Sequence, residues 1–95
     1  MPTTYFLLRW SPGPTFPPGL TFRNAPLDDH IAYIKTALAD GNVKYAGPFV
    51  DGSGGMTVIQ APSLADARAF AENDPAFVRG AIVVEIKEWK VLFGG

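Results

Sequence analysis

The chain has 95 residues, of which 47% are hydrophobic and 18% charged, and its formal net charge is −1. This length fits a single domain over residues 1–95, and the apolar content excludes a disordered chain. The eight basic residues are scattered, so the basic patch of a nucleic-acid-binding protein is absent and we expect no nucleic-acid partner.

The N-terminal third predicts a strand followed by a long loop. Thr4–Trp10 is rich in aromatic and aliphatic residues and contains no glycine or proline, which is typical of a strand. Ser11–Pro26 holds five prolines and two glycines in sixteen residues. A loop of that composition is either functional or an ordered arm across the surface, anchored by Phe16 and Phe22.

A helix is expected over Pro26–Ala39. Proline suits a first helical position, acidic residues favour the helix N-terminus, and Gly41 supplies a stop signal. Apolar residues at helical spacing predict its buried stripe. They are Leu27, Ile31, Ile34 and Leu38.

A hairpin is expected next. Val43–Val50 reads as a strand bent at Gly47-Pro48, and a glycine-rich turn begins at Asp51. Met56–Gln60 would return as the partner strand.

The C-terminal part predicts a helix and a last strand. Ser63 precedes a helix over Leu64–Glu72, which Asn73-Asp74-Pro75 ends. A short helical turn over Ala76–Arg79 then leads into a strand over Ala81–Trp89.

The resulting order is β-α-β-β-α-β, which predicts a ferredoxin-like α+β fold with two helices on one face of a four-stranded antiparallel sheet. The strands carry large apolar side chains on both faces of the sheet. The face without helices must therefore be shielded from solvent by another layer of protein. We expect a homodimer that pairs these faces as a dimeric α+β barrel.

Several segments together resemble the YCII family. They are H-x-x-Y-I from His30, A-G-P-x-x-D-G-x-G-G from Ala46 and N-D-P-A-F-V-R-G from Asn73. The resemblance implies a dimeric α+β barrel. It also implies a candidate active-site pair that matches His30 and Asp51, while Asp74 matches the aspartate of the family's D-P motif.

A related member of the family is a dehydrochlorinase that acts on a chlorinated hydroxyhydroquinone. This chain differs from many relatives in its proline-rich loop and in having Glu88 before Trp89. Because of the proline-rich loop, the substrate of that relative is not assigned to this chain.

His30 is the only histidine and lies at the edge of the apolar stripe. It is either a general acid or base oriented by Asp51, or a polar tether that holds the glycine-rich turn. Asp51 by itself is typical of a turn, in which an aspartate side chain bonds the backbone two residues further on. Asp74 either caps the following turn or presents a polar group at the pocket rim.

Further side chains are expected to bind substrate. Arg9 would hold an anionic group if its face of the strand is covered, and would be solvated if it is not. The pocket would be lined by Tyr33, Phe49 and Phe16.

The sequence also limits the chemistry. The chain has no cysteine and one histidine, so a transition-metal site and a thiolate nucleophile are not expected, and we expect no cofactor. No apolar run is long enough to span a bilayer and no signal pattern precedes the first strand, so the expected location is cytoplasmic, without a membrane partner.

Three functions remain open at this point. The first is an enzyme that uses proton transfer on a small molecule, of the lyase or isomerase type. The second is a non-catalytic module that binds a small molecule. The third is a structural subunit that docks through its apolar tail, Val91–Phe93.

Overall fold

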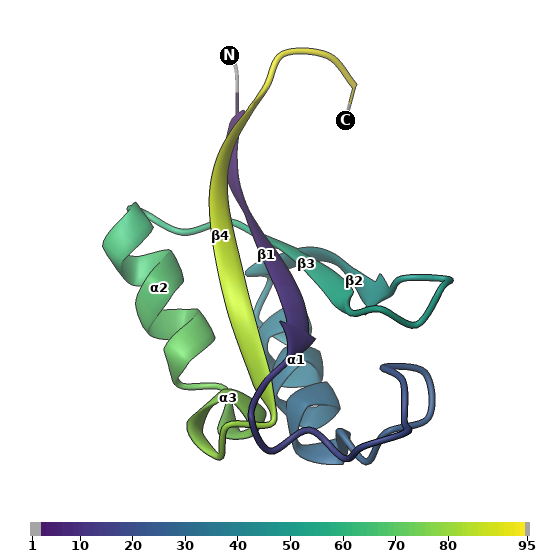
Figure 1. Cartoon of the computed structure of the whole chain (residues 1–95). Helices are drawn as coiled ribbons and strands as arrows, with labels where there is room; N and C mark the ends of the chain where they lie inside the picture. Colours follow the sequence, from purple (N-terminus) through teal and green to yellow (C-terminus); the bar gives the residue numbers. More distant parts are fainter. Residues whose placement is uncertain (1–2, 95) are drawn as a thin grey trace.

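The computed structural model describes residues 3–94 and confirms the predicted α+β order, including the short helical turn before the last strand (Figure 1). The elements are β1 (Thr3–Pro12), α1 (Asp28–Ala39), β2 (Val43–Pro48), β3 (Gly55–Ile59), α2 (Leu64–Glu72), α3 (Pro75–Val78) and β4 (Ile82–Val91). The sheet order is β2-β3-β1-β4 and every neighbouring pair is antiparallel. The fold is therefore the ferredoxin-like arrangement.

Alternation along β1 sets the two faces of the sheet. Phe6, Leu8 and Trp10 are buried under the helices, whereas Arg9 is exposed on the opposite face. The register places Trp10 opposite Gly55 of β3 and Val84 of β4. Because Gly55 has no side chain, Trp10 has no directly opposite side chain on β3.

The two long helices cover one face of the sheet (Figure 1). On α2, Ala67 and Ala71 are fully buried, and such small side chains allow a helix to lie close to a sheet. On α1, Ile34 and Ala37 are buried. No helix in this described part of the chain combines the length and apolar character needed to cross a membrane.

The predicted stripe on α1 is wrong at two positions. Ile31 is 48% exposed and Leu38 54% exposed. Helical spacing gives the direction of a side chain but not the extent of the sheet beneath it. Here β3 has only five residues and β2 six, and these two side chains border a cleft instead of entering the core.

All four strands differ from the expected limits by one or two residues at one or both ends. β1 spans Thr3–Pro12 rather than Thr4–Trp10, and β3 spans Gly55–Ile59 rather than Met56–Gln60. β2 ends at Pro48 rather than Val50, because Phe49 N–H donates to Gly54 C=O at 2.8 Å and closes the turn. β4 continues past Trp89 to Val91. A Cβ at Gly54 would collide with the carbonyl oxygen of Trp10, so the turn needs glycine there to reach the end of β1.

The proline-rich loop is an ordered arm. Gly13 N–H donates to Ala81 C=O at 2.9 Å at its start, and Phe22 N–H donates to Gly52 C=O at 3.0 Å near its end. The rings of Phe16 and Phe22 stack with centroids 5.5 Å apart. The arm thus links the beginning of β4 to the β2–β3 turn.

Candidate functional site

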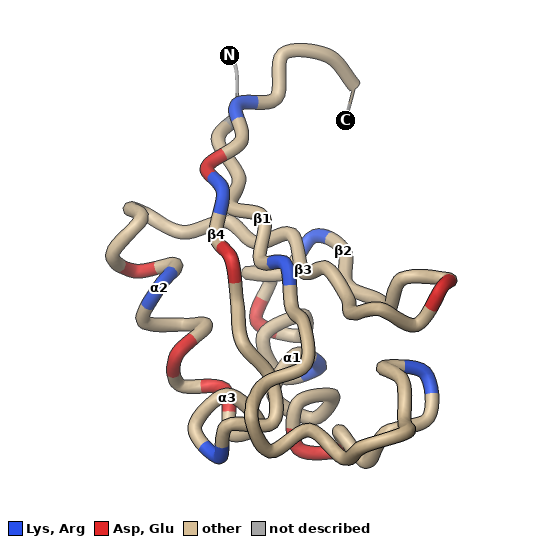
Figure 2. The backbone as a smooth tube through the Cα atoms, in the orientation of Figure 1, with Lys and Arg blue, Asp and Glu red and all other residues tan. Residues whose placement is uncertain are grey.

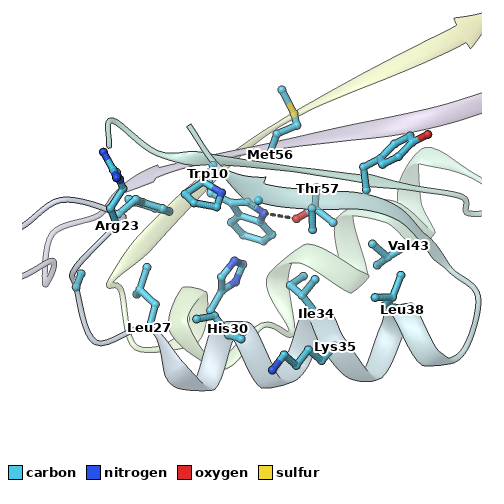
Figure 3. A pocket seen from close by; sticks show the side chains of 18 of the residues that line it. Trp10, Arg23, Leu27, His30, Ile34, Lys35, Leu38, Val43, Met56 and Thr57 are labelled. Carbon is cyan, nitrogen blue, oxygen red and sulfur yellow. Dashed lines mark hydrogen bonds between the residues drawn. The ribbon is translucent and has the colours of Figure 1, made fainter. Parts of the chain in front are cut away.

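A cleft of about 590 Å³ lies between α1 and the strands β2 and β3. We call it the α1–β2 cleft. Its volume is in the range of small-molecule sites. Leu27, His30 and Ile34 point into it from α1, and Trp10 faces them from the sheet (Figure 3). The cleft is thus an apolar slot with an imidazole in one wall.

His30 is paired with Asp74. Its Nδ1 lies 2.5 Å from Asp74 Oδ2, and the side chains are 14% and 0% exposed. The other carboxylate oxygen accepts the N–H of Ala76 at 2.9 Å and so caps α3. Asp74 is the residue before Pro75, whose ring suits the first position of that short helix.

This pairing fixes which imidazole nitrogen can react. A carboxylate only accepts hydrogen bonds, so Nδ1 carries the proton and donates it. Within residues 3–94 the protein supplies no hydrogen-bond partner to Nε2. A neutral His30 therefore has a free lone pair on Nε2 and can act as a proton acceptor for a molecule in the cleft.

Trp10 packs against the other side of the imidazole. The ring centroids of Trp10 and His30 are 5.1 Å apart and the planes meet at 72°, an edge-on contact. The indole Nε1 donates to Thr57 Oγ1 at 3.0 Å in the core (Figure 3). The indole is thus anchored to β3 while its ring lies against the imidazole.

A second connection joins the same two helices. Arg79 donates to Asp29 through Nε and Nη2, at 2.8 and 3.1 Å, and Nη2 also donates to Pro26 C=O at 3.2 Å. Asp29 precedes His30, and Arg79 follows α3. These hydrogen bonds of Arg79, which we call the Arg79 clamp, therefore keep Asp74 beside His30. The Arg79 hydrogen bond, as its largest cause, lowers the pKa of Asp29 below the ordinary 3.8.

The Asp29–Arg79 pair should make part of the free energy of unfolding sensitive to acid. The pKa of Asp29 is lower in the folded protein than its ordinary value of 3.8. Ionised Asp29 therefore contributes its full share of the folding stability above pH 3.8, and this share is lost as pH falls through the folded pKa. Both side chains are over a third exposed or close to it, so solvent screening limits the contribution to about 0.5–1 kcal/mol. In urea titrations, Asp29→Asn should be less stable than wild type at pH 7 by this amount.

The difference should shrink as pH falls below about 4. Glu72→Gln on α2, which breaks the exposed Arg68–Glu72 pair of 3.8 Å, is the matched control and should cost less at pH 7. An Asp29→Asn deficit that persists undiminished at low pH would contradict this account.

The expected partner of His30 was not the observed one. Asp51 is exposed on the β2–β3 turn and accepts from the N–H and hydroxyl of Ser53, at 2.9 and 2.7 Å. The hydroxyl hydrogen bond is the main cause that lowers the pKa of Asp51. The structure thus brings His30 together with Asp74, whereas Asp51 bonds only within its own turn.

The other predicted side chains lie away from the cleft. Arg9 is on the open sheet face, 4.0 Å from Glu85. Tyr33 donates its hydroxyl to Phe70 C=O at 2.8 Å, and burial followed by the charge of Asp74 raises its pKa. Phe16 stacks in the arm, and Phe49 belongs to the turn.

Several cleft residues were missed by the sequence analysis. Trp10 and Thr57 were read only as strand residues, and Ile31 and Leu38 as core. A tryptophan at the end of a strand was the available signal for Trp10. Among residues 3–94 there is no group of three or more His, Cys, Asp or Glu side chains able to hold a metal ion.

The family model of the YCII-related domain matches residues 14–90. The uncharacterized protein YjpA of Bacillus subtilis (strain 168) is 34% identical over 70 residues, which are 74% of this chain and 82% of YjpA.

Among solved structures, one similar fold is 5-chloro-2-hydroxyhydroquinone dehydrochlorinase (TftG) of Burkholderia phenoliruptrix AC1100, in complex with 2,5-dihydroxybenzoquinone. The TM-score is 0.59 at 22% identity, over 90% of this chain and 93% of that one. At this identity the likeness concerns the fold. The family model and the relative YjpA together show that the chain belongs to the YCII family.

Proposed function

We propose that this protein is a small-molecule enzyme that works by proton transfer, with His30 as the general base or acid and Asp74 as the residue that orients it. The observation that carries the proposal is the imidazole in the cleft wall with Nδ1 bonded to a fully buried carboxylate. Such an arrangement holds one tautomer and presents Nε2 to a bound molecule.

The reaction type we propose is a lyase or isomerase reaction that needs no metal. His30 would remove a proton from carbon, and the electron pair left behind would form a double bond or expel a leaving group. The fold is shared with a protein named as a dehydrochlorinase, and loss of hydrogen and chloride is a reaction of this type. One acid–base group and a shaped pocket suffice for such chemistry.

The test is proton exchange, which requires no knowledge of the physiological substrate. A panel of hydroxylated aromatic compounds and keto acids is incubated with the protein in D₂O, and loss of each C–H signal is followed by proton NMR. Wild type should accelerate exchange of at least one compound, and His30→Asn should lower that rate by about 10²–10⁴-fold. Binding without exchange would favour the alternative function, a non-catalytic module that holds a small molecule.

We also propose that the protein forms a homodimer through the open face of the sheet. This face carries half-exposed Trp89 and Val83, strongly exposed Tyr45, and the paired charges of Arg9 and Glu85. A twofold axis would allow the same face to serve on both copies. Sedimentation at micromolar concentration should give a dimer, and Trp89→Glu should yield a monomer.

A further inference from the structure

The α1–β2 cleft has one sign of charge. Its charged lining residues are Arg23, Lys35 and Lys44, and no aspartate or glutamate lines it. They come from the arm, α1 and β2, and Figure 2 shows a basic segment on each of these three parts of the chain. The chain as a whole has more acidic than basic residues, nine against eight, so the positive lining is a local feature.

These three cations have no carboxylate partner within residues 3–94. The salt bridges of this part of the chain engage Arg9, Arg68 and Arg79 instead. Arg23 donates from one nitrogen to Val50 C=O at 3.2 Å, which does not neutralise its charge. A cleft with low-dielectric walls and unpaired charges of one sign concentrates the field and attracts a ligand of the opposite sign.

The rest of the lining requires an apolar ligand body. Ile31 and Leu38 line the cleft and are about half exposed, and burial of apolar surface by a ligand is favourable. Between helix and sheet the space is a slot with Leu38 on the helix side, whereas the Lys35 side chain runs along α1 on the side away from the sheet (Figure 3). A flat apolar body with an anionic group at one edge satisfies both kinds of lining.

We infer that the α1–β2 cleft binds an aromatic anion, such as an aromatic carboxylate, whose ring lies along Ile31 and Leu38 while the basic side chains that border the cleft, Lys35 and Lys44 among them, attract its charge. The inference deepens the proposed function, because it names the substrate class of that site. It also separates two tasks. The basic side chains would attract the anionic group, and His30 would be left free to transfer a proton.

The test compares 2-naphthoate with its neutral analogue 2-naphthamide. Binding is followed by the NMR signals of the His30 ring, which are unambiguous in a chain with one histidine, and of the Trp10 indole, assigned with Trp89→Phe. Naphthoate should bind about tenfold more tightly than naphthamide, and the preference should weaken with salt. In Lys35→Gln/Lys44→Gln the preference should fall to about twofold.

Matched controls isolate the cause. Lys87→Gln/Lys90→Gln removes the same charge from β4, outside the cleft, and should leave most of the preference intact. His30→Asn should also keep the preference for naphthoate, although this variant removes proton transfer. Failure of the catalytic proposal can therefore be distinguished from failure of the binding inference. Equal binding of acid and amide, no binding of naphthoate at millimolar concentration, or a preference lost only in His30→Asn would each overturn the inference.

Discussion

Asp74→Asn is expected to move the imidazole proton of His30 from Nδ1 to Nε2 and so to abolish proton transfer while the fold survives. In wild type one carboxylate oxygen accepts from Ala76 N–H and the other faces His30 Nδ1. The asparagine oxygen must keep the Ala76 contact, because an amide NH₂ there would face another donor. The NH₂ group then faces Nδ1, which has to become an acceptor.

The consequence is a base that can no longer accept a proton at the cleft. Exchange of any compound that wild type processes should fall by about 10²–10⁴-fold. Asparagine caps a helix about as well as aspartate, so stability should change much less than activity. The tautomer is read directly from the ¹⁵N shifts of the two ring nitrogens, at a pH where the ring is neutral.

The control is Asp51→Asn. Asp51 bonds only Ser53 in the structure, so this variant should leave the ring signals of His30 unchanged. The opposite result, a tautomer that responds to Asp51→Asn and not to Asp74→Asn, would contradict the pairing described above.

The fold was predictable because its signals are local. Alternation in β1 gives the two faces, since Phe6, Leu8 and Trp10 share one side of any strand that includes them. The cap at Ser63, whose hydroxyl accepts from Asp66 N–H at 3.1 Å, fixes the start of α2 within a few residues. Such features need no knowledge of distant parts of the chain.

The site was only partly predictable because it depends on contacts between distant segments. A lone histidine at the edge of an apolar stripe could be singled out from the sequence. Its partner lies 44 positions later, and the choice between Asp51 and Asp74 depends on how α3 docks beside α1. The D-P motif explained Asp74 as a cap, and one carboxylate oxygen does act so. The second oxygen makes the contact with His30 that spacing could not reveal.

His30→Ala is expected to cost about 3–5 kcal/mol of unfolding free energy, a large part of the total for a domain of this size. The cost arises mainly at Asp74, which is 0% exposed and would be left in the core without its hydrogen-bonded partner. Loss of the edge-on contact with Trp10 at 5.1 Å adds about 0.5–1.5 kcal/mol to the penalty.

His30→Asn separates this structural cost from the catalytic one. Its amide nitrogen can take the place of Nδ1 and donate to Asp74, but it offers nothing in the place of Nε2. In urea unfolding it should therefore recover at least half of the stability that His30→Ala loses, and in proton exchange it should be as inactive. Equal destabilisation by both variants would mean that the amide cannot replace the Nδ1 hydrogen bond. A loss below about 1 kcal/mol in His30→Ala would mean that water reaches Asp74 through the cleft and replaces the imidazole.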